Sequence, residues 1–177
     1  MTRPPTPSEE GGLPVASVAV IIHPRDRGGS VLLIKRTERS NDPWSGQIGF
    51  PGGHKSPNES FLQTAIREAE EEVGIHLNEA QLLGCLPMVI TLSRRVEVAP
   101  FVFKLESGVE IRANREVAES FWVPLLTLAR LEVKKHSVQL DDSDVEVNCF
   151  DYQGRIIWGL TFRILNLMLG RRLDDEL

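Results

Sequence analysis

The feature that most constrains this chain is a glutamate-rich stretch, Gly53 to Ile75, that directly follows a glycine-rich loop. Apolar residues recur in it at the three- and four-residue spacing of an α-helix, namely Leu62, Ala65, Ile66, Ala69 and Val73. Gly74 then supplies a left-handed stop. We therefore expect one helix face to pack on a core, which leaves the charged residues on the other face.

The start of this helix carries its own signals. Ser56 is the expected N-cap, with Pro57 at the first helical position and Glu59 as the capping-box partner. Glu59 has either this capping role or a direct part in catalysis. Arg67 lies four residues before Glu71, so we expect it to pair with Glu71 or Glu59 and to orient their carboxylates.

Three glutamates, Glu68, Glu71 and Glu72, are spaced to lie on one side of the helix. Three carboxylates at one place repel one another unless a cation lies among them. Hard oxygen ligands suit Mg²⁺ or Mn²⁺ better than zinc, so we predict a metal site built on these residues. The alternative is a solvated acidic helix face.

The loop before the helix, Asp42 to Gly53, is built to bring backbone close to a ligand. Its glycines, at positions 46, 49, 52 and 53, leave no side chain in the way. A carbonyl group in such a loop can serve as a metal ligand.

The spacing of Gly53, Glu59, Arg67-Glu68, Glu71-Glu72 and Gly74-Ile75 resembles the signature of the Nudix hydrolases. Ala69 is the one soft point, since the family more often has a bulky aliphatic residue there. This resemblance implies hydrolysis of a diphosphate bond in a nucleoside diphosphate joined to another group. It also implies an α/β/α sandwich with a mixed sheet, and it makes the carbonyl of Gly52 a metal ligand.

The segment VLLIKRTERSNDPWSGQIGFPGG is similar to the one that precedes this signature in the coenzyme A pyrophosphatase branch of the family. RANREVAESFWVPL and GRIIWGLTFRIL are also similar to that branch. The resemblance implies cleavage of coenzyme A or acyl-coenzyme A to 3′,5′-ADP and phosphopantetheine or its acyl form. The loop from Glu38 to Trp44 departs from the branch by one residue, and ADP-ribose or a nucleoside diphosphate sugar is the alternative substrate.

Four further residues are candidates for the substrate site. Arg36 and Arg39 are expected to bind substrate phosphates, because a guanidinium presents a fixed fork to phosphate oxygens. Trp44 either stacks on a nucleobase or closes the edge of a sheet. Glu116 lies after the signature, and the resemblance implies a further acidic residue there. Glu71 or Glu116 is then the expected general base.

Composition favours a single compact enzyme domain. The chain has 177 residues, 41% hydrophobic, with a net charge of −5, which argues against a general nucleic-acid binder. No apolar run reaches the length that a membrane span requires. Two widely separated cysteines, Cys85 and Cys149, fit a reduced cytoplasmic setting. The expected partner is a small-molecule nucleotide, and the oligomeric state stays open, a homodimer included.

Residues 1–14 are rich in proline and read as a flexible tail, so the domain is expected over residues 15–177. Strands are expected at Ala16–His23 and Val31–Lys35 as a hairpin, and then at Gln81–Pro87, Val96–Lys104, Ser120–Pro124, Val145–Tyr152 and Gly154–Ile157. Leu125–Leu131 reads as a short helix, and Ile156–Leu169 as a helix packed on the core. This order indicates an α+β layered fold.

Two readings of other classes stay open. A non-catalytic nucleotide-sensing module would be expected to have lost metal ligands, and none of the ligand positions is altered here. An enzyme that processes nucleic-acid 5′ ends would be expected to carry a basic stripe, which this acidic chain lacks.

Overall fold

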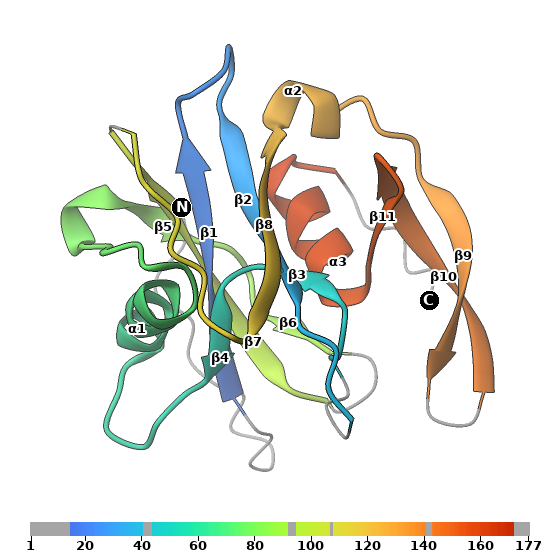
Figure 1. Cartoon of the computed structure of the whole chain (residues 1–177), viewed down its shortest axis with the longest axis horizontal. Helices are drawn as coiled ribbons and strands as arrows, with labels where there is room; N and C mark the ends of the chain where they lie inside the picture. Colours follow the sequence, from blue (N-terminus) through green and yellow to red (C-terminus); the bar gives the residue numbers. More distant parts are fainter. Residues whose placement is uncertain (1–14, 41–43, 92–94, 107, 141–142, 172–177) are drawn as a thin grey trace.

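The structure, a computed structural model, describes residues 15–40, 44–91, 95–106, 108–140 and 143–171; the predicted tail, residues 1–14, lies outside them. In chain order the elements are β1 (Val15–His23), β2 (Ser30–Arg36), β3 (Ile48–Gly49), β4 (Gly52–His54), α1 (Phe61–Val73), the 3₁₀ turn η1 (Glu79–Gln81), β5 (Leu82–Cys85), β6 (Val89–Ile90), β7 (Glu97–Lys104), β8 (Val117–Pro124), α2 (Leu125–Leu128), β9 (Lys134–Leu140), β10 (Ser143–Tyr152), β11 (Arg155–Trp158) and α3 (Gly159–Met168). Helix α1 covers one face of the larger sheet, and α3 covers the other (Figure 1).

The larger sheet is mixed. Strand β1 pairs antiparallel with β2 and β4 and parallel with β7, while β8 pairs antiparallel with β2. The expected hairpin of β1 and β2 is therefore confirmed. Residues Ala16 to Ile21 of β1 are buried one after another, because this strand is central and both of its faces are covered. The expected α+β sandwich with a mixed sheet is confirmed.

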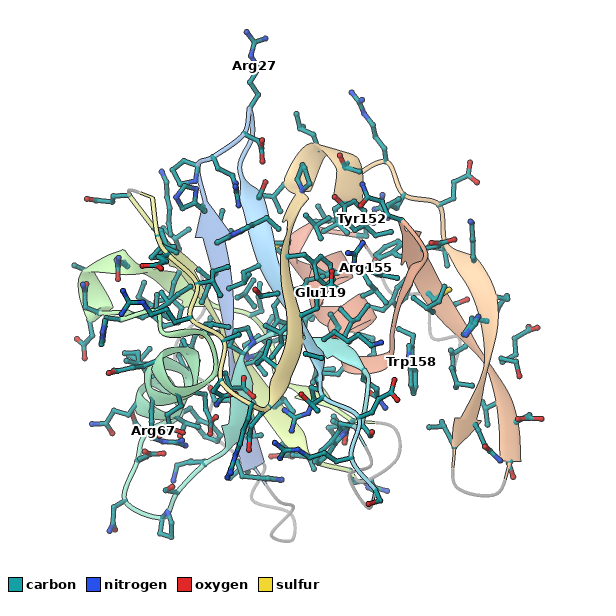
Figure 2. All side chains as sticks on the ribbon, in the orientation of Figure 1. Arg27, Arg67, Glu119, Tyr152, Arg155 and Trp158 are labelled. Carbon is teal, nitrogen blue, oxygen red and sulfur yellow. The ribbon has the colours of Figure 1, made fainter. Side chains whose placement is uncertain are left out.

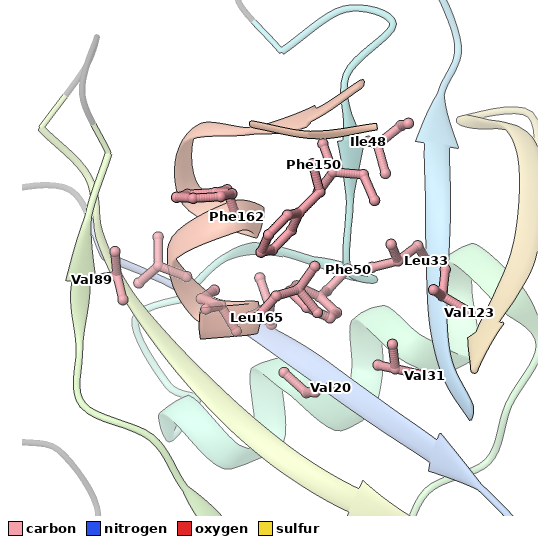
Figure 3. Close-up of a cluster of buried hydrophobic side chains, with 14 of the residues drawn as sticks. Val20, Val31, Leu33, Ile48, Phe50, Val89, Val123, Phe150, Phe162 and Leu165 are labelled. Atoms are coloured by element: carbon pink, nitrogen blue, oxygen red, sulfur yellow. The ribbon is translucent and has the colours of Figure 1, made fainter. Parts of the chain in front are cut away.

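Each face of the larger sheet has its own hydrophobic core. Helix α1 packs Ala65, Ala69 and Val73 against one face, as its apolar stripe predicts. On the other face, α3 and the three-stranded sheet β11-β10-β9 close over a second cluster (Figure 3). There the rings of Phe150 and Phe162 lie with centroids 4.7 Å apart at 50°. The sheet is thus held from both sides, which fixes the ends of its strands.

The predicted start of α1 was wrong. The N-cap is Ser60, whose hydroxyl accepts from the Gln63 N–H while the Gln63 side chain accepts from the Ser60 N–H. This reciprocal pair satisfies the first free N–H groups of the helix. Ser56 and Glu59 instead form a turn before the helix. The helix does stop at Gly74, where φ is 68°.

Two expectations for the C-terminal part needed correction. The predicted helix over Ile156–Leu169 begins only at Gly159, because the three residues before it pair with β10 as β11. Strand β9 was not predicted, since most of its side chains are exposed and no buried face imposes an alternating pattern. Within the part of the chain that the structure describes, no helix has the length and apolar character needed to cross a membrane.

Candidate active site

The glycine-rich loop and the glutamate helix meet where β4 passes under α1. A Cβ atom on Gly52 would lie 2.5 Å from the Ser17 carbonyl oxygen, and one on Gly53 would lie 2.4 Å from Glu68 Oε1. Both distances are far below van der Waals contact, so a side chain at either position would have to displace its neighbour. The backbone of β4 is thereby brought directly against the carboxylates of the helix.

Glu72 is the most buried of the predicted ligands, with its side chain 3% exposed. One carboxylate oxygen accepts from the Gly52 N–H at 2.9 Å, and the other lies 3.3 Å from Arg36 Nη1. Burial raises the pKa of Glu72 to about 7, although the Gly52 N–H and the Arg36 charge both act to lower it. Two partners thus leave the desolvation of this carboxylate only partly compensated.

Glu68 lies one helical turn before Glu72 and is 14% exposed. Its Oε1 atom is 2.8 Å from Arg67 Nη1. Burial raises the pKa of Glu68 as well, against the lowering effect of Arg67. The charges of Glu116 and Glu68 raise the pKa of Glu72 further, so negative charge is concentrated here without full compensation.

The expected convergence of three carboxylates is not what the structure shows. Glu71 is 54% exposed and pairs with Arg67 at 2.9 Å, and it does not line the cavity that Glu68 and Glu72 line. Successive helix residues are about 100° apart around the axis, so Glu71 can point to solvent although Glu72 beside it is buried. Among the described residues, no group of three or more acidic, His or Cys side chains is close enough to hold a metal ion.

Arg67 has the orienting position that its spacing predicts. Its guanidinium contacts Glu59 at 2.7 Å, Glu68 at 2.8 Å and Glu71 at 2.9 Å. The hydrogen bond from Arg67 lowers the pKa of Glu59 to about 2. Glu59 also accepts from the Thr64 hydroxyl, so it anchors Arg67 rather than capping α1. Arg67 lies outside the cavity and acts on it through Glu68.

Arg36, at the end of β2, enters the cavity and pairs with Glu72. Glu116, just before β8, also lines the cavity. It is 38% exposed and pairs with Arg39 at 3.2 Å, while Arg39 also donates to the Arg115 carbonyl. Arg39 itself does not line the cavity. The structure therefore separates the two predicted phosphate-binding arginines into an inner and an outer one.

The cavity measures about 280 Å³, and its lining contains two chemically different groups of residues. We call one group the polar wall; it consists of Arg36, Gly52, Glu68, Glu72 and Glu116. We call the other group the apolar chamber; it consists of Val18, Val96, Val98, Leu140, Trp158 and Leu160. Trp44 also lines the cavity, with its ring centroid 5.9 Å from that of the exposed His54. Both proposed roles of Trp44 stay predictions.

A second, polar hollow adjoins the cavity and shares Gln47, Ile48 and Trp158 with it. Its lining includes three cationic side chains, those of Lys35, Arg39 and Arg155. Arg155 pairs with Glu119 across the gap between the two sheets and lies over the Phe121 ring at 4.6 Å (Figure 2). This contact holds the three-stranded sheet beside β8 and so fixes the walls of the polar hollow.

The polar wall fits a divalent cation. Two largely buried carboxylates with raised pKa values lack a full complement of donors, and a cation would supply the missing compensation. Their oxygens are hard ligands of the kind that Mg²⁺ and Mn²⁺ prefer. Gly52 lines the cavity beside Glu72, where its carbonyl is the predicted additional ligand.

Sequence reasoning missed the apolar chamber. Its residues come from β1, the start of β7, the end of β9 and the β11–α3 junction, and each has the character of an ordinary core residue. Nothing in their local spacing distinguishes a cavity wall from a filled core. Only Trp158 and Leu160, both within the segment GRIIWGLTFRIL, lay in a stretch singled out by resemblance.

Comparison with known proteins agrees with this geometry. The model of the NUDIX domain matches residues 13–142. The uncharacterized Nudix hydrolase NudL of Photorhabdus laumondii is 36% identical over 138 residues, covering 76% of this chain and 73% of that protein. NudL of Pectobacterium atrosepticum is 32% identical over 162 residues, and the match covers 90% of this chain and 81% of that protein.

Among solved structures, the MutT protein from Methanosarcina mazei Go1 is similar, with a TM-score of 0.55 and 27% identity. The match covers 71% of this chain and 86% of that one. The family match spans well over half of the chain and includes the whole polar wall. The chain therefore belongs to the Nudix family and is a diphosphate-bond hydrolase.

Proposed function

We propose that the protein hydrolyses coenzyme A and acyl-coenzyme A, with Mg²⁺ or Mn²⁺, to 3′,5′-ADP and phosphopantetheine or its acyl form. Support comes from the segments that resemble the coenzyme A pyrophosphatase branch, before Gly53 and around Trp158. In the fold these two segments lie together, since Gln47, Ile48 and Trp158 line the same cavity.

One observation carries the proposal: the polar wall shares its cavity with an apolar chamber, and Arg39 of the adjoining hollow, which contains cationic side chains, pairs with Glu116 of the polar wall. Coenzyme A has matching parts, namely a diphosphate, an uncharged pantetheine arm and a nucleotide that bears an additional 3′-phosphate. Lys35, Arg39 and Arg155 line the hollow, although each has an acidic partner. Arg39 is the proposed contact for the 3′-phosphate, because it is the outer of the two predicted arginines.

The chemistry needs a water to attack phosphorus while the bridging oxygen departs. One P–O bond forms, the bridging P–O bond breaks, and the water proton is released. A divalent cation held by the polar wall would neutralise diphosphate charge and lower the pKa of a bound water. Glu68, Glu72 and the Gly52 carbonyl are the proposed ligands, and Arg36 holds Glu72 in place and reaches the diphosphate.

Two acidic residues, Glu71 and Glu116, are candidates to accept the proton of the attacking water. We assign it to Glu116, because Glu116 lines the cavity and the alternative, Glu71, lies outside it. Arg39 pairs with Glu116 at 3.2 Å and so holds the carboxylate at the cavity mouth. Arg67 orients Glu68 and does not touch the reacting atoms.

A substrate panel with Mg²⁺ and Mn²⁺, with products identified by mass, tests the proposal. Coenzyme A and acetyl-coenzyme A should be cut with the highest kcat/KM, giving 3′,5′-ADP. The Glu72→Gln variant, purified in parallel, controls for contaminating phosphatases. Cleavage of ADP-ribose or a nucleoside diphosphate sugar with much higher kcat/KM would overturn the substrate assignment and leave the diphosphate chemistry in place.

We also propose a reducing, cytoplasmic setting. Cys85 and Cys149 are both buried, and no disulfide joins them in the structure. Burial raises the pKa of the Cys149 thiol, which lowers its reactivity. Cell fractionation with an antibody to the chain tests this setting, and recovery in an oxidising compartment would contradict it.

A further inference from the structure

The apolar chamber is the part of the cavity that the reaction at the polar wall does not use. Val18, Val96 and Val98 are buried in its floor, and Leu140, Trp158 and Leu160 form half-buried walls. Two hydroxyl groups also line the cavity, and both are engaged by backbone. Thr91 accepts from the Val96 N–H at 2.9 Å, and Thr161 donates to the Ile48 carbonyl at 2.8 Å.

The walls of the chamber are tied in place by hydrogen bonds. The Thr161 bond holds the first turn of α3 to β3, and Arg163 Nη1 donates to the Ile90 carbonyl at 2.8 Å, which holds α3 to β6. Gly159 precedes this turn with φ of 59°. These contacts fix α3 relative to β3 and β6, and so hold the chamber residue Leu160 in place.

Trp158 separates the chamber from the polar hollow, because it lines both. On one side of it lie aliphatic groups, and on the other lie the side chains of Arg155 and His136. Figure 2 shows Trp158 at the end of β11, next to β3. A substrate that extends past Trp158 on both sides contacts an apolar lining on one side and a polar lining on the other.

We propose that the apolar chamber binds the acyl-pantetheine arm of the substrate, with Trp158 and Leu160 setting preference for the acyl chain. This inference rests on the proposed function. A purine is recognised by hydrogen bonds along its edges, whereas the described lining of the chamber consists of five aliphatic side chains and Trp158, whose indole N–H is the one polar group among them, and the hydroxyls of Thr91 and Thr161 are engaged by backbone. A methylene chain needs only removal from water, which this lining provides.

The first experiment measures kcat/KM for coenzyme A and for its acetyl, butanoyl, hexanoyl and octanoyl thioesters. Each buried methylene is worth up to about fourfold. Since the chamber is partly open, we expect a rise of at least about tenfold from acetyl to octanoyl in the wild type. A flat series, with coenzyme A still cleaved, would overturn the inference and leave the proposed function intact.

Two variants test the chamber by different means. Leu160→Trp fills it, and Leu160→Ser makes its wall polar without filling it. In both, the octanoyl-to-acetyl ratio of kcat/KM should fall to about one, because the gain from burial is lost. Trp158→Ala should also lower the ratio, and Trp158→Phe should retain most of it.

Trp122→Phe is the matched control. Trp122 lies on β8, packs against His23 and Arg25, and lines neither the cavity nor the hollow. It should keep the wild-type ratio. A change in the control equal to that in the Leu160 variants would show a general effect on the fold and would overturn the assignment.

A binding measurement separates this inference from the proposed function. S-octanoyl-pantetheine has no diphosphate, so calorimetry with this probe reports on the chamber alone. Binding that is lost in Leu160→Trp supports the inference even where coenzyme A is not cleaved, a result that would overturn the proposed function. The opposite result would be loss of 3′,5′-ADP binding in Leu160→Trp while S-octanoyl-pantetheine still binds. It would place the adenine of the substrate in the chamber and overturn the inference.

Discussion

The polar wall and the apolar chamber face the same cavity but are assembled differently. Most of the polar wall comes from one short stretch, since Gly52, Glu68 and Glu72 lie on β4 and the helix that follows it. The chamber draws on β1, β7, β9 and α3, which are far apart in sequence. A local stretch can encode chemistry, whereas the shape of a substrate site depends on how distant elements pack.

We expect the largest effect on activity from a comparison of two adjacent residues, Glu72 in the polar wall and Glu71 on the surface of α1. Glu72→Gln keeps the shape and removes a negative ligand, so kcat should fall by at least about 10²-fold. Glu71→Gln should cost far less, because Glu71 lies outside the cavity. Steady-state kinetics check this, with Glu70→Gln as the control, since Glu70 is exposed and its carboxylate pairs with His76.

Equal losses in Glu71→Gln and Glu72→Gln would show that Glu71 turns into the cavity when metal and substrate bind. Full activity in Glu72→Gln would remove this residue from the metal site.

The second prediction concerns the stability of the metal-free protein. Burial raises the pKa of Glu72 in the folded protein to about 7, above its ordinary value of 4.5. The folded state therefore binds more protons than the unfolded state between these values, so the free energy of unfolding falls as pH rises through this window. The loss amounts to up to about 3 kcal/mol.

Denaturant melts with a chelator, from pH 4.5 to 8, check this expectation against Glu72→Gln, in which the decline should be smaller. Carboxylates with lowered pKa, such as Glu59 and Asp151, act in the opposite sense and are common to both proteins.

Adding Mg²⁺ should raise the melting temperature of the wild type, because it binds the native state. Replacing Glu68, Glu71 and Glu72 together with glutamine should abolish that rise; a wild type insensitive to Mg²⁺ would contradict the metal site.

The third prediction uses the two glycines of β4. A Cβ on Gly53 meets only the end of the flexible Glu68 side chain, so Gly53→Ala should fold well and displace that carboxylate. Since misplacement on the order of 1 Å can cost up to about 10²-fold, kcat should fall by about tenfold or more.

Gly52→Ala provides the contrast. Its Cβ would meet the backbone of Ser17, which cannot move aside, so this variant should lose about 1–3 kcal/mol of stability. Thermal melts and kinetics of the two variants, measured together, separate the effects. A Gly53→Ala enzyme with unchanged kcat would show that the Glu68 position is not critical.

We expect the smallest effect on activity from the exposed pair Arg39–Glu116, whose side chains are both about 40% exposed. If Arg39 contacts the 3′-phosphate, coenzyme A should be preferred over dephospho-coenzyme A by about threefold to tenfold, because an exposed charge contact is screened by solvent. Arg39→Gln should erase that preference, measured as a ratio of kcat/KM. An unchanged ratio would move the 3′-phosphate to Lys35 or Arg155.

Sequence patterns predicted some elements well and others poorly. The β1–β2 hairpin, β7 and the stop of α1 at Gly74 were all predicted, because buried strands and a left-handed glycine leave strong local signals. The start of α1 was placed four residues too early, since two serines each precede an acidic or amide residue at capping-box spacing. In the structure Glu59 accepts from the Ser56 N–H and pairs with Arg67, while Ser60 and Gln63 make the reciprocal bonds of the N-cap.

What the sequence determined by itself is the chemistry of the polar wall: carboxylates at helical spacing, an arginine to orient them, and glycines that allow close approach. The helical spacing of these residues is a local property, so it can be read from the sequence without knowledge of the tertiary structure. Which carboxylates face inward was decided by the tertiary structure. Adjacent Glu71 and Glu72 are distinguished only by the rotation of α1 against the sheet, which burial of Ala65, Ala69 and Val73 imposes. The apolar chamber was likewise decided by packing, because a cavity is a gap between elements and no single residue records it.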